Sequence, residues 1–559
     1  MRPRSARQAR ALRPVSFVFV ALLASLAAGP GCTRVGNLQH PGQRNSWTMP
    51  GVLRMAGRQD PDTLDVLLGT QTVDTDLSMF WAGYLFNWSD RNRLEPELAV
   101  REPTVANGDI SRDGLTIVYR LRRGVLWQDG APFGADDVIY TWHQMLNPRN
   151  AVTTRIGYDV VSNIERRGPY TIAVHLKHRF APFVASFFTM ANHPDCILPK
   201  HLLAQYPDIN HVAYNDLPVG TGPFRIARYE RGTAIEFVAN ERYWRGPPKL
   251  ARIDYRIIPS DNTMLAMLQS HQLDFFFRAP ETMAESLRNV PGTRVVLSPF
   301  TRYADIGFNA AVPALGDVRM RQALAYATDR RSLIDKVTHG ITIAGDTDQP
   351  PFFWAYDPHA RHYAYDLGLA QRMLDAAGWR RTQPGGIRER RGVPLALTLV
   401  SFTGSGTAAA AEALIQAQWR QAGVDVTIKN YPSGQLYATK SMGGIEQSGK
   451  FDVIFENWAN GTDPDDSILI LCSMAPPAGW NVYHFCSPAL DAAERTALAS
   501  YDPAVRRAAY ARIQEIAAEG LPFLVLWYQR ELDVVNTDLK NYRPAHAVTP
   551  FWNAWQWSI

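Results

Sequence analysis

The stretch Asp113–Val138, DGLTIVYRLRRGVLWQDGAPFGADDV, decides the fold of this chain. Its composition predicts a strand over Leu115–Leu121 and a second, shorter strand over Val125–Trp127. The Arg-Arg-Gly and Asp-Gly steps beside these runs are typical of turns. Two acidic residues after Ala135 favour a helix start there, because carboxylates stabilise the N-terminus of a helix. The segment therefore predicts a strand–turn–strand–turn–helix unit.

The remainder of the chain is organised as alternating strands and helices. Its 559 residues predict two to four domains. After Tyr303 the succession of strand and helix patterns favours an α/β sheet with helices on its faces. The predicted strands are ADIGFN (304–309), LALTLV (395–400), VDVTIKNY (424–431), FDVIFENW (451–458) and LPFLVLWY (521–528). The predicted helices are VRMRQALAYATDRRSLIDKV (318–337), Tyr365–Trp379, Ala408–Gln421 and Val505–Glu519.

The N-terminus carries an export signal. Five arginines precede an apolar run, Val15–Ala28, which is followed by small residues up to Cys32. We expect residues 1–31 to be a signal peptide and residues 32–47 to be a spacer. Cys32 after Gly31 resembles the lipidated cysteine of bacterial lipoproteins, although Gly29 stands where that motif usually has leucine. The alternative is a plain secreted protein in which Cys32 has no special role.

Charge and motif content exclude several function classes. The net charge is +5, and much of it belongs to the signal segment, so nucleic-acid binding has no electrostatic support. The sequence contains no G-x-S-x-G, no H-E-x-x-H and no spaced histidine–cysteine set. We therefore predict no catalytic residue, no metal site and no cofactor, and we do not expect an enzyme.

The cysteines predict one disulfide. Cys472 and Cys486 enclose a short loop rich in proline, glycine and aromatic residues. In an oxidising compartment this pair predicts a local disulfide, which stabilises a protein by roughly 3 kcal/mol for so short a loop. Cys196 is predicted to be a buried thiol.

Several motifs, taken in order, resemble a known family. The opening segment is similar to the signature of the large extracytoplasmic solute-binding proteins of family 5, which serve dipeptide, oligopeptide and nickel ABC transporters. The resemblance extends from about Asp60 to the C-terminus. The matching motifs are PDTLD (61–65), GTGPF (220–224), YWRGPPKL (243–250), DVRMRQALAYATDR (317–330), AAGW (376–379) and FDVIFENW (451–458).

The resemblance implies a fold that the residue patterns alone do not give. Such proteins have a two-lobe, periplasmic-binding-protein-like α/β fold of type II, with an extra subdomain in lobe I and the ligand enclosed between the lobes. It places lobe I at 48–300 with the subdomain inserted, lobe II at 301–528, and a return to lobe I at 529–559.

The resemblance also implies a function. We expect an extracytoplasmic, monomeric protein, anchored through Cys32, that captures a peptide and delivers it to the permease and ATPase of an ABC importer. Two alternatives remain open. The ligand could instead be an oligosaccharide or a metal chelate, or the protein could be a sensor or chaperone that takes no part in transport.

Three loops are the predicted ligand contacts. In peptide-binding members an aspartate shortly after a tryptophan receives the α-ammonium group of the peptide, whereas this chain has asparagine and glycine there, and its aspartates follow later. A turn with capping aspartates is the structural alternative for that loop. Dipeptide-binding relatives carry an arginine near 401–407, where this chain has none, and backbone N–H groups around Gly404 could bind an anion instead. The predicted contacts are Thr70, Gln71, Thr72, Phe402, Thr403, Gly404, Trp458, Asn460, Asp463 and Asp465.

Overall fold

A computed structural model describes residues 44–155, 157–190, 195–546 and 550–559. The predicted signal peptide, Cys32 and nearly all of the predicted spacer lie outside the described residues. Residues 45–559 make up one unit of the chain.

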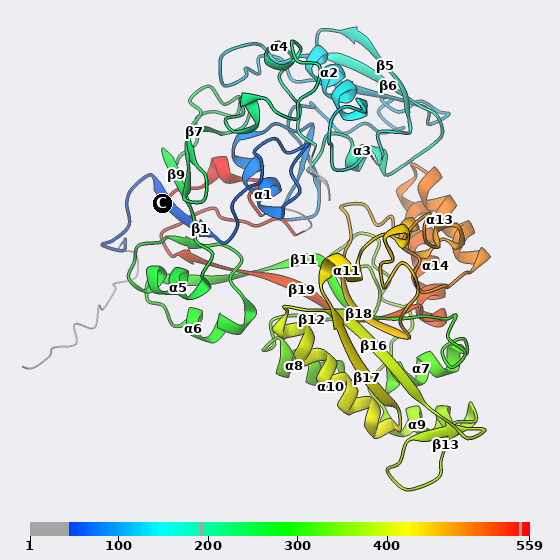
Figure 1. Ribbon diagram of the computed structural model, residues 1–559. Coiled ribbons are helices and arrows are strands. Elements are labelled where there is room, and N and C mark those ends of the chain that lie inside the picture. Colours follow the sequence, from blue (N-terminus) through cyan, green and yellow to red (C-terminus); the bar gives the residue numbers. More distant parts are fainter. Residues whose placement is uncertain (1–43, 156, 191–194, 547–549) are drawn as a thin grey trace, which may run out of the picture. The chain divides into compact units, whose positions relative to one another are not determined.

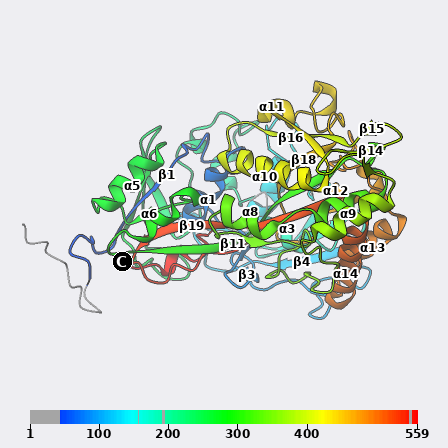
Figure 2. The same ribbon diagram turned by 90° about the horizontal axis from the view of Figure 1, so that it is seen from below.

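One large sheet extends through both lobes (Figure 1). Its central strands, β11 and β19, are much longer than the others and lie antiparallel along each other (Figure 2). β18 pairs with the second part of β11, from Arg302 to Phe308, while β10 pairs with the end of β19. The strand order is β17 (Asp425–Tyr431), β16 (Ala396–Phe402), β18 (Val453–Ala459), β11 (Thr293–Phe308), β19 (Phe523–Asn536), β10 (Phe275–Phe276), β1 (Val52–Gly57), β9 (Arg252–Ile257), β8 (Ala234–Ala239) and β7 (Phe224–Glu230), and β12 (Ile343–Ala344) pairs with β19.

The two long strands contain an irregularity at their middle. The register between β11 and β19 shifts between Pro299 and Tyr303. Such a bulge bends a strand and redirects its side chains. The predicted lobe boundaries, after residues 300 and 528, fall at this place on the two strands, and the boundaries themselves stay predictions.

Lobe I combines its part of the large sheet with an inserted subdomain. In the subdomain, α2 accompanies a separate antiparallel sheet of β4, β6 and β5. The C-terminal segment packs against α1, since Phe551 stacks on Phe80 with ring centres 5.0 Å apart, and the predicted return of 529–559 to lobe I stays a prediction. The bounds are α1 (Thr72–Trp81), β2 (Phe86–Trp88), β3 (Leu94–Pro96), β4 (Thr116–Arg120), α2 (Ala135–Leu146), β5 (Val161–Gly168), β6 (Thr171–Leu176), α3 (Phe183–Ser186), α4 (Lys200–Leu203), α5 (Asp261–Gln269) and α6 (Ala284–Arg288).

Lobe II has helices on both faces of its strands. One apolar core joins the sheet to α7 (Val318–Tyr326), α8 (Arg330–Val337), α9 (Leu367–Ala376) and α10 (Gly406–Ala422). A second core on the other face includes α11 (Ser433–Leu436), α12 (Ser467–Ile470), α13 (Pro488–Ala499) and α14 (Pro503–Gly520). A small sheet of β13 (Arg380–Arg381), β14 (Arg388–Arg390) and β15 (Val393–Pro394) follows α9. The predicted α/β arrangement is confirmed.

The segment Asp113–Val138 forms two of its three predicted elements. β4 and α2 are confirmed, with α2 starting at Ala135 as predicted. The strand over Val125–Trp127 is wrong, because the only bridge in this run joins Leu126 to Pro132 within the same turn. Proline has no N–H group, so Pro132 cannot extend the pairing into a ladder.

The segment holds several distant parts of lobe I together. The side chain of Gln128 accepts a hydrogen bond from the N–H of Gly220 at 3.1 Å and donates one to the carbonyl of Phe224 at 2.7 Å. A Cβ atom on Gly220 would lie 1.8 Å from the carbonyl oxygen of Trp81, so only glycine fits there. The signature and the GTGPF turn thus meet at the end of α1, where their role is structural.

The predicted helix over 318–337 is wrong in extent. The structure ends α7 at Tyr326 and starts α8 at Arg330. Asp329 is the reason, because its side chain accepts a hydrogen bond from the N–H of Ser332 at 3.0 Å and so caps a new helix. The apolar spacing of the sequence continues across this break and conceals it.

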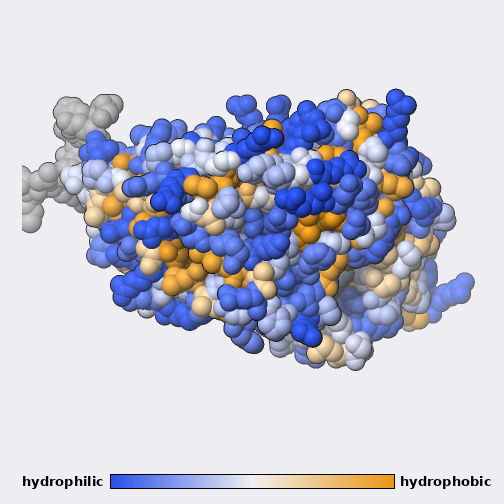
Figure 3. Space-filling model, turned by 90° about the horizontal axis from the view of Figure 1, so that it is seen from above, coloured by the Kyte–Doolittle hydropathy of each residue, from blue (hydrophilic) through white to orange (hydrophobic). Residues whose placement is uncertain are grey.

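The described helices include none that is long and apolar enough to cross a membrane. The face of the molecule seen in Figure 3 is mostly hydrophilic, with small apolar patches scattered among the polar residues.

Candidate ligand-binding site

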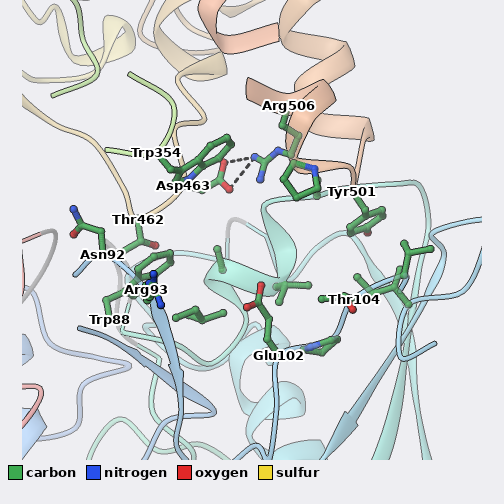
Figure 4. A pocket seen from close by; sticks show the side chains of 18 residues that line it. Trp88, Asn92, Arg93, Glu102, Thr104, Trp354, Thr462, Asp463, Tyr501 and Arg506 are labelled. Atoms are coloured by element: carbon green, nitrogen blue, oxygen red, sulfur yellow. Dashed lines mark hydrogen bonds and ion pairs between the residues drawn. The ribbon is translucent and has the colours of Figure 1, made fainter. Parts of the chain in front are cut away.

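A cavity of about 450 Å³ lies between the two lobes, and we call it the interlobe cavity. Lobe I lines it with the β2–β3 hairpin and with residues 102–105 and 181–185 among others. Lobe II lines it with Trp354, Thr462, Asp463, Tyr501, Pro503 and Arg506 (Figure 4). Its size and its mixture of aromatic and charged side chains are typical of small-ligand sites.

One ion pair dominates the lobe II wall of the interlobe cavity. Arg506 Nη2 lies 2.6 and 2.8 Å from the two carboxylate oxygens of Asp463, and each side chain is only 11% exposed. The guanidinium also lies 5.2 Å from the centre of the Trp354 ring. Burial opposes the charge of Arg506, but Asp463 holds the pKa of this arginine above its ordinary value. The pair therefore supplies a fixed, polar wall without excess charge.

Hydrogen bonds connect the lobes around this cavity. The side chain of Asn92 donates to the carbonyl of Phe352 at 3.0 Å, and the N–H of Ala181 donates to the carbonyl of Leu498 at 2.7 Å. The Tyr501 hydroxyl is 3.2 Å from the carbonyl oxygen of Gly114. These contacts place both lobes within reach of one enclosed ligand.

A second pocket, of about 280 Å³, lies where the long strands leave lobe I, and we call it the hinge pocket. Its walls come from the start of α1, the end of β1, and strands β9, β11 and β19. The lining residues are Gly57, Arg58, Gln59, Thr72, Val73, Asp76, Tyr255, Phe277, Arg278, Arg302 and Glu531.

Arg278 organises the charges of the hinge pocket. Its guanidinium lies 2.5 Å from the carboxylate of Asp76, which is 1% exposed, and 2.7 Å from that of Glu531. Burial opposes its charge, yet Asp76 and Glu531 together raise the pKa of Arg278. The backbone of Arg278 has a φ of 51°, in the left-handed region, and its N–H donates to Asp533 at 2.9 Å. These contacts on both sides hold the residue in a conformation that is uncommon for arginine.

The first predicted contact loop lies at the hinge pocket. Thr72 lines the pocket as the first residue of α1. Thr70 and Gln71 line neither cavity. The Thr70 hydroxyl donates to Asp62 at 2.6 Å, and the N–H of Gln71 donates to Asp74 at 2.9 Å. Their observed contacts belong to the loop and to the helix start.

The second predicted loop lines neither cavity. Phe402 is half-buried, whereas Thr403 and Gly404 are exposed. The side chain of Ser405 accepts a hydrogen bond from the N–H of Ala408 at 3.1 Å and so caps α10. An anion at this helix start, as the sequence suggested, would meet a terminus that is already capped.

In the third predicted loop, one residue lines the interlobe cavity and the others make structural contacts. Asp463 lines the interlobe cavity in its ion pair with Arg506. The side chain of Asn460 is 2% exposed and donates to the carbonyl of Asp348 at 2.7 Å. Asp465 accepts from the N–H of Ser467 at 3.0 Å, as in a capped turn, and Trp458 packs against the second lobe II core. The ligand roles of these residues stay predictions.

The sequence reasoning did not select the charged residues of the hinge pocket. Arg278, Arg302 and Glu531 come from three segments, and two of them lie in the largely apolar strands β11 and β19, each next to a buried residue. A charged residue that interrupts a buried strand is uncommon unless it is paired or functional. That signal was present in the sequence for Arg302 and Glu531.

The cysteines lie apart from both cavities. Cys472 and Cys486 are joined by a disulfide, and Cys196 is a buried free cysteine. Burial raises the pKa of the Cys196 thiol well above its ordinary value, which makes it unreactive. Among the described residues, no group of three or more metal-ligating side chains has the arrangement of a metal site.

Comparison with known proteins gives a consistent result along nearly the whole chain. Residues 93–478 match the model of the bacterial extracellular solute-binding proteins, family 5. The chain is 30% identical to protein XP55 of Streptomyces lividans over 472 residues, which cover 83% of this chain and 81% of that protein. It is 25% identical to the oligopeptide-binding protein AppA of Bacillus subtilis over 507 residues, which cover 89% and 90% of the two chains.

Solved structures show the same fold. The structure of AppA with a nonapeptide superposes with a TM-score of 0.70 at 24% identity, covering 91% of this chain and 99% of that one. The structure of NikZ from Campylobacter jejuni with Ni(L-His) gives a TM-score of 0.73 at 24% identity, with coverages of 92% and 100%. These likenesses confirm the predicted two-lobe α/β fold of type II.

Proposed function

Because the chain belongs to family 5 of the bacterial extracellular solute-binding proteins, we propose that it captures peptides for an ABC importer. It is a binding protein and not an enzyme, as are the proteins that it resembles. In this proposal the protein acts as a monomer outside the cytoplasm, is held to the membrane through a lipidated Cys32, and delivers its ligand to a permease and ATPase complex.

The interlobe cavity is the observation that carries the proposal. Both lobes line it, so a ligand in the cavity contacts both of them at once. Such a ligand stabilises whichever arrangement of the lobes gives it more contacts, and this difference in affinity drives closure. Closure in turn presents a surface made of both lobes, which a permease could recognise.

The walls of the interlobe cavity fit a peptide better than they fit a strongly charged solute. Arg506 and Asp463 neutralise each other, and Trp88, Trp354 and Tyr501 provide apolar area for side chains of different size. Backbone N–H and C=O groups of the lobes can pair with the main chain of a peptide irrespective of its sequence. Water can fill the space that smaller side chains leave.

A non-peptide solute is the main alternative. NikZ shares this fold and was solved with Ni(L-His), so the fold itself does not select peptides. An oligosaccharide or a metal chelate would need different partners in the same cavity. A protein that senses or chaperones peptides without transport would bind the same ligands but would not associate with a permease.

Native mass spectrometry of the protein as purified tests the proposal. We expect bound masses that correspond to peptides. We also expect Trp354→Ala to retain at least about tenfold less peptide, because truncating an aromatic hot spot costs about 2 kcal/mol or more. Trp552→Ala, a change outside both cavities, serves as the control. Bound masses that correspond only to small sugars or metal complexes would exclude the peptide function.

A further inference from the structure

We propose that Arg302 binds a carboxylate group of the ligand in the hinge pocket. The proposal rests on the proposed function, because it concerns one end of a peptide held by the same protein. The sequence left the partner of the ligand carboxylate unassigned, since the 401–407 loop contains no arginine. In the structure, an arginine of strand β11 is available for this role instead.

Strand geometry directs Arg302 into the pocket. The residue lies within the irregular part of β11, between Pro299 and Tyr303, where the register against β19 shifts. The bulge redirects the side chain out of the regular alternation of the strand. The guanidinium lies 5.2 Å from the centre of the Phe300 ring and lines the hinge pocket.

Arg302 is the cation of this pocket that lacks an ion-pair partner. Arg278 is paired with Asp76 and Glu531, and Arg58 is paired with Asp261 at 2.5 Å. Among the residues that the structure describes, no carboxylate oxygen lies within 4.0 Å of the guanidinium of Arg302. The nearby Glu531 attracts it, but Glu531 already forms an ion pair with Arg278, in which a carboxylate oxygen lies 2.7 Å from Nε.

A partly buried charge without an ion-pair partner raises the free energy of the protein, because it has lost contact with water. Binding an anion offsets this desolvation cost. Burial lowers the pKa of Arg302, and the charge of Arg278 beside it acts in the same direction. A carboxylate in the pocket would offset both effects. Guanidinium groups also match the two oxygens of a carboxylate in geometry.

Two neighbours make the pocket suited to an anion next to a peptide. The first residues of α1, Thr72 and Val73, form part of its wall, and a threonine hydroxyl such as that of Thr72 can donate a hydrogen bond to an anion. Arg302 pairs directly with Ala459 of β18, between Trp458 and Asn460. A carboxylate at Arg302 would therefore lie beside the segment in which the sequence predicted ligand contacts.

A competition between free and amidated peptides tests the proposal. The probe is an equimolar pool of random-sequence peptides of two to six residues without aspartate or glutamate, with free C-termini, mixed with the same pool as C-terminal amides. Native mass spectrometry measures the ratio of acid to amide retained by the wild-type protein. We expect a preference for the acid of about 30-fold or more, as for other buried charge pairs that lose one partner.

Arg302→Gln should abolish this preference and Arg302→Lys should keep part of it. Arg495→Gln is the control, because it removes a positive charge from the surface of α13, where Arg495 lines neither cavity. We expect this control to retain the wild-type ratio. Using a ratio removes any general effect of the substitutions on the amount of active protein.

Each result has a distinct meaning. A preference for the acid that survives Arg302→Gln would overturn the role of Arg302. Equal retention of acid and amide by the wild type would overturn it as well, while leaving peptide capture intact. Retention of neither form would overturn the proposed function itself.

Discussion

In the hinge pocket Arg278 lies between the carboxylates of Asp76 and Glu531, whereas in lobe II three carboxyl groups lie together without a basic partner. The three are Asp305, Glu446 and Glu456, and each is at most 4% exposed. Asp305 and Glu456 are directly opposite each other on β11 and β18. Among the described residues, no arginine, lysine or histidine forms an ion pair with any of the three.

The two regions show two ways to bury carboxyl groups. At the hinge, the positive charge of Arg278 compensates the charge of the two carboxyl groups beside it. In lobe II, where none of the described arginines forms an ion pair with the three carboxyl groups, binding a proton neutralises their charge. Burial raises the pKa of Asp305, Glu446 and Glu456, and the charge of Glu456 raises that of the other two further. Within the described ranges, the only hydrogen bond to Glu456 from a side chain comes from the Tyr483 hydroxyl, at 2.9 Å. The hinge cluster therefore depends on its arginine, and the lobe II cluster depends on pH.

The largest expected effect is the loss of the hinge arginine. Arg278→Met removes the arginine from its ion pairs with Asp76 and Glu531, and breaking a buried pair typically costs about 3–5 kcal/mol. Denaturant unfolding at pH 7 measures the change. Arg58→Met, which breaks a surface pair, is the control and should change the free energy of unfolding by less than about 1 kcal/mol. Similar values for the two variants would show that the hinge cluster does not depend on Arg278.

An intermediate effect is expected from pH. The folded state holds protons on the lobe II carboxyls at pH values where the unfolded chain has released them. The stabilising contribution of these carboxyls is thus complete below their ordinary pKa and is lost as pH rises toward their folded values, about 7 for Glu456 and about 10 for Glu446. Glu446→Gln keeps the neutral form at every pH. It should reduce the loss of stability between pH 5 and pH 8 by about 1.4 kcal/mol or more, the value of one pKa unit.

Unfolding curves of wild type and Glu446→Gln at both pH values measure this difference. Glu515→Gln, which removes an exposed carboxylate on α14, is the control and should leave the pH dependence as it is in the wild type. If Glu446→Gln and the wild type lose the same free energy of unfolding between pH 5 and pH 8, the pKa of Glu446 is not raised by burial and by Glu456 as the structure indicates.

The smallest expected effect separates the two arginines of the hinge pocket. Arg302→Gln breaks no ion pair in the described structure and removes a charge that burial disfavours. The free energy of unfolding should therefore change by less than about 0.5 kcal/mol or rise. Chemical denaturation without ligand measures it. A loss as large as that of Arg278→Met would make Arg302 a structural residue and contradict its assignment to the ligand.

The sequence predicted the fold through local patterns and the order of motifs. Strand β4 and helix α2 form where the opening segment predicts them, because turn residues and a capped helix start act over a few positions. The failures are also local. Pro132 prevents a ladder after Val125–Trp127, and Asp329 starts a new helix within 318–337, although the apolar spacing continues through both places.

The candidate site was predicted less completely. Of the predicted contacts, Thr72 lines the hinge pocket and Asp463 lines the interlobe cavity. The partner of Asp463, Arg506, lies 43 residues away on another element, and no sequence pattern linked the two. A loop can be aligned by motif, but its contacts depend on which distant segments fold against it.

The sequence by itself determined the family, the α/β elements and the absence of catalytic motifs, because these follow from residue order and from interactions between near neighbours. Only the tertiary structure decided which charges meet. Thr72, Arg278, Arg302 and Glu531 come from four separate segments, and the pairing of β11 with β19 brings them to one pocket. Electrostatic energy depends on the distance between charges and on their burial, and the sequence alone gives neither quantity.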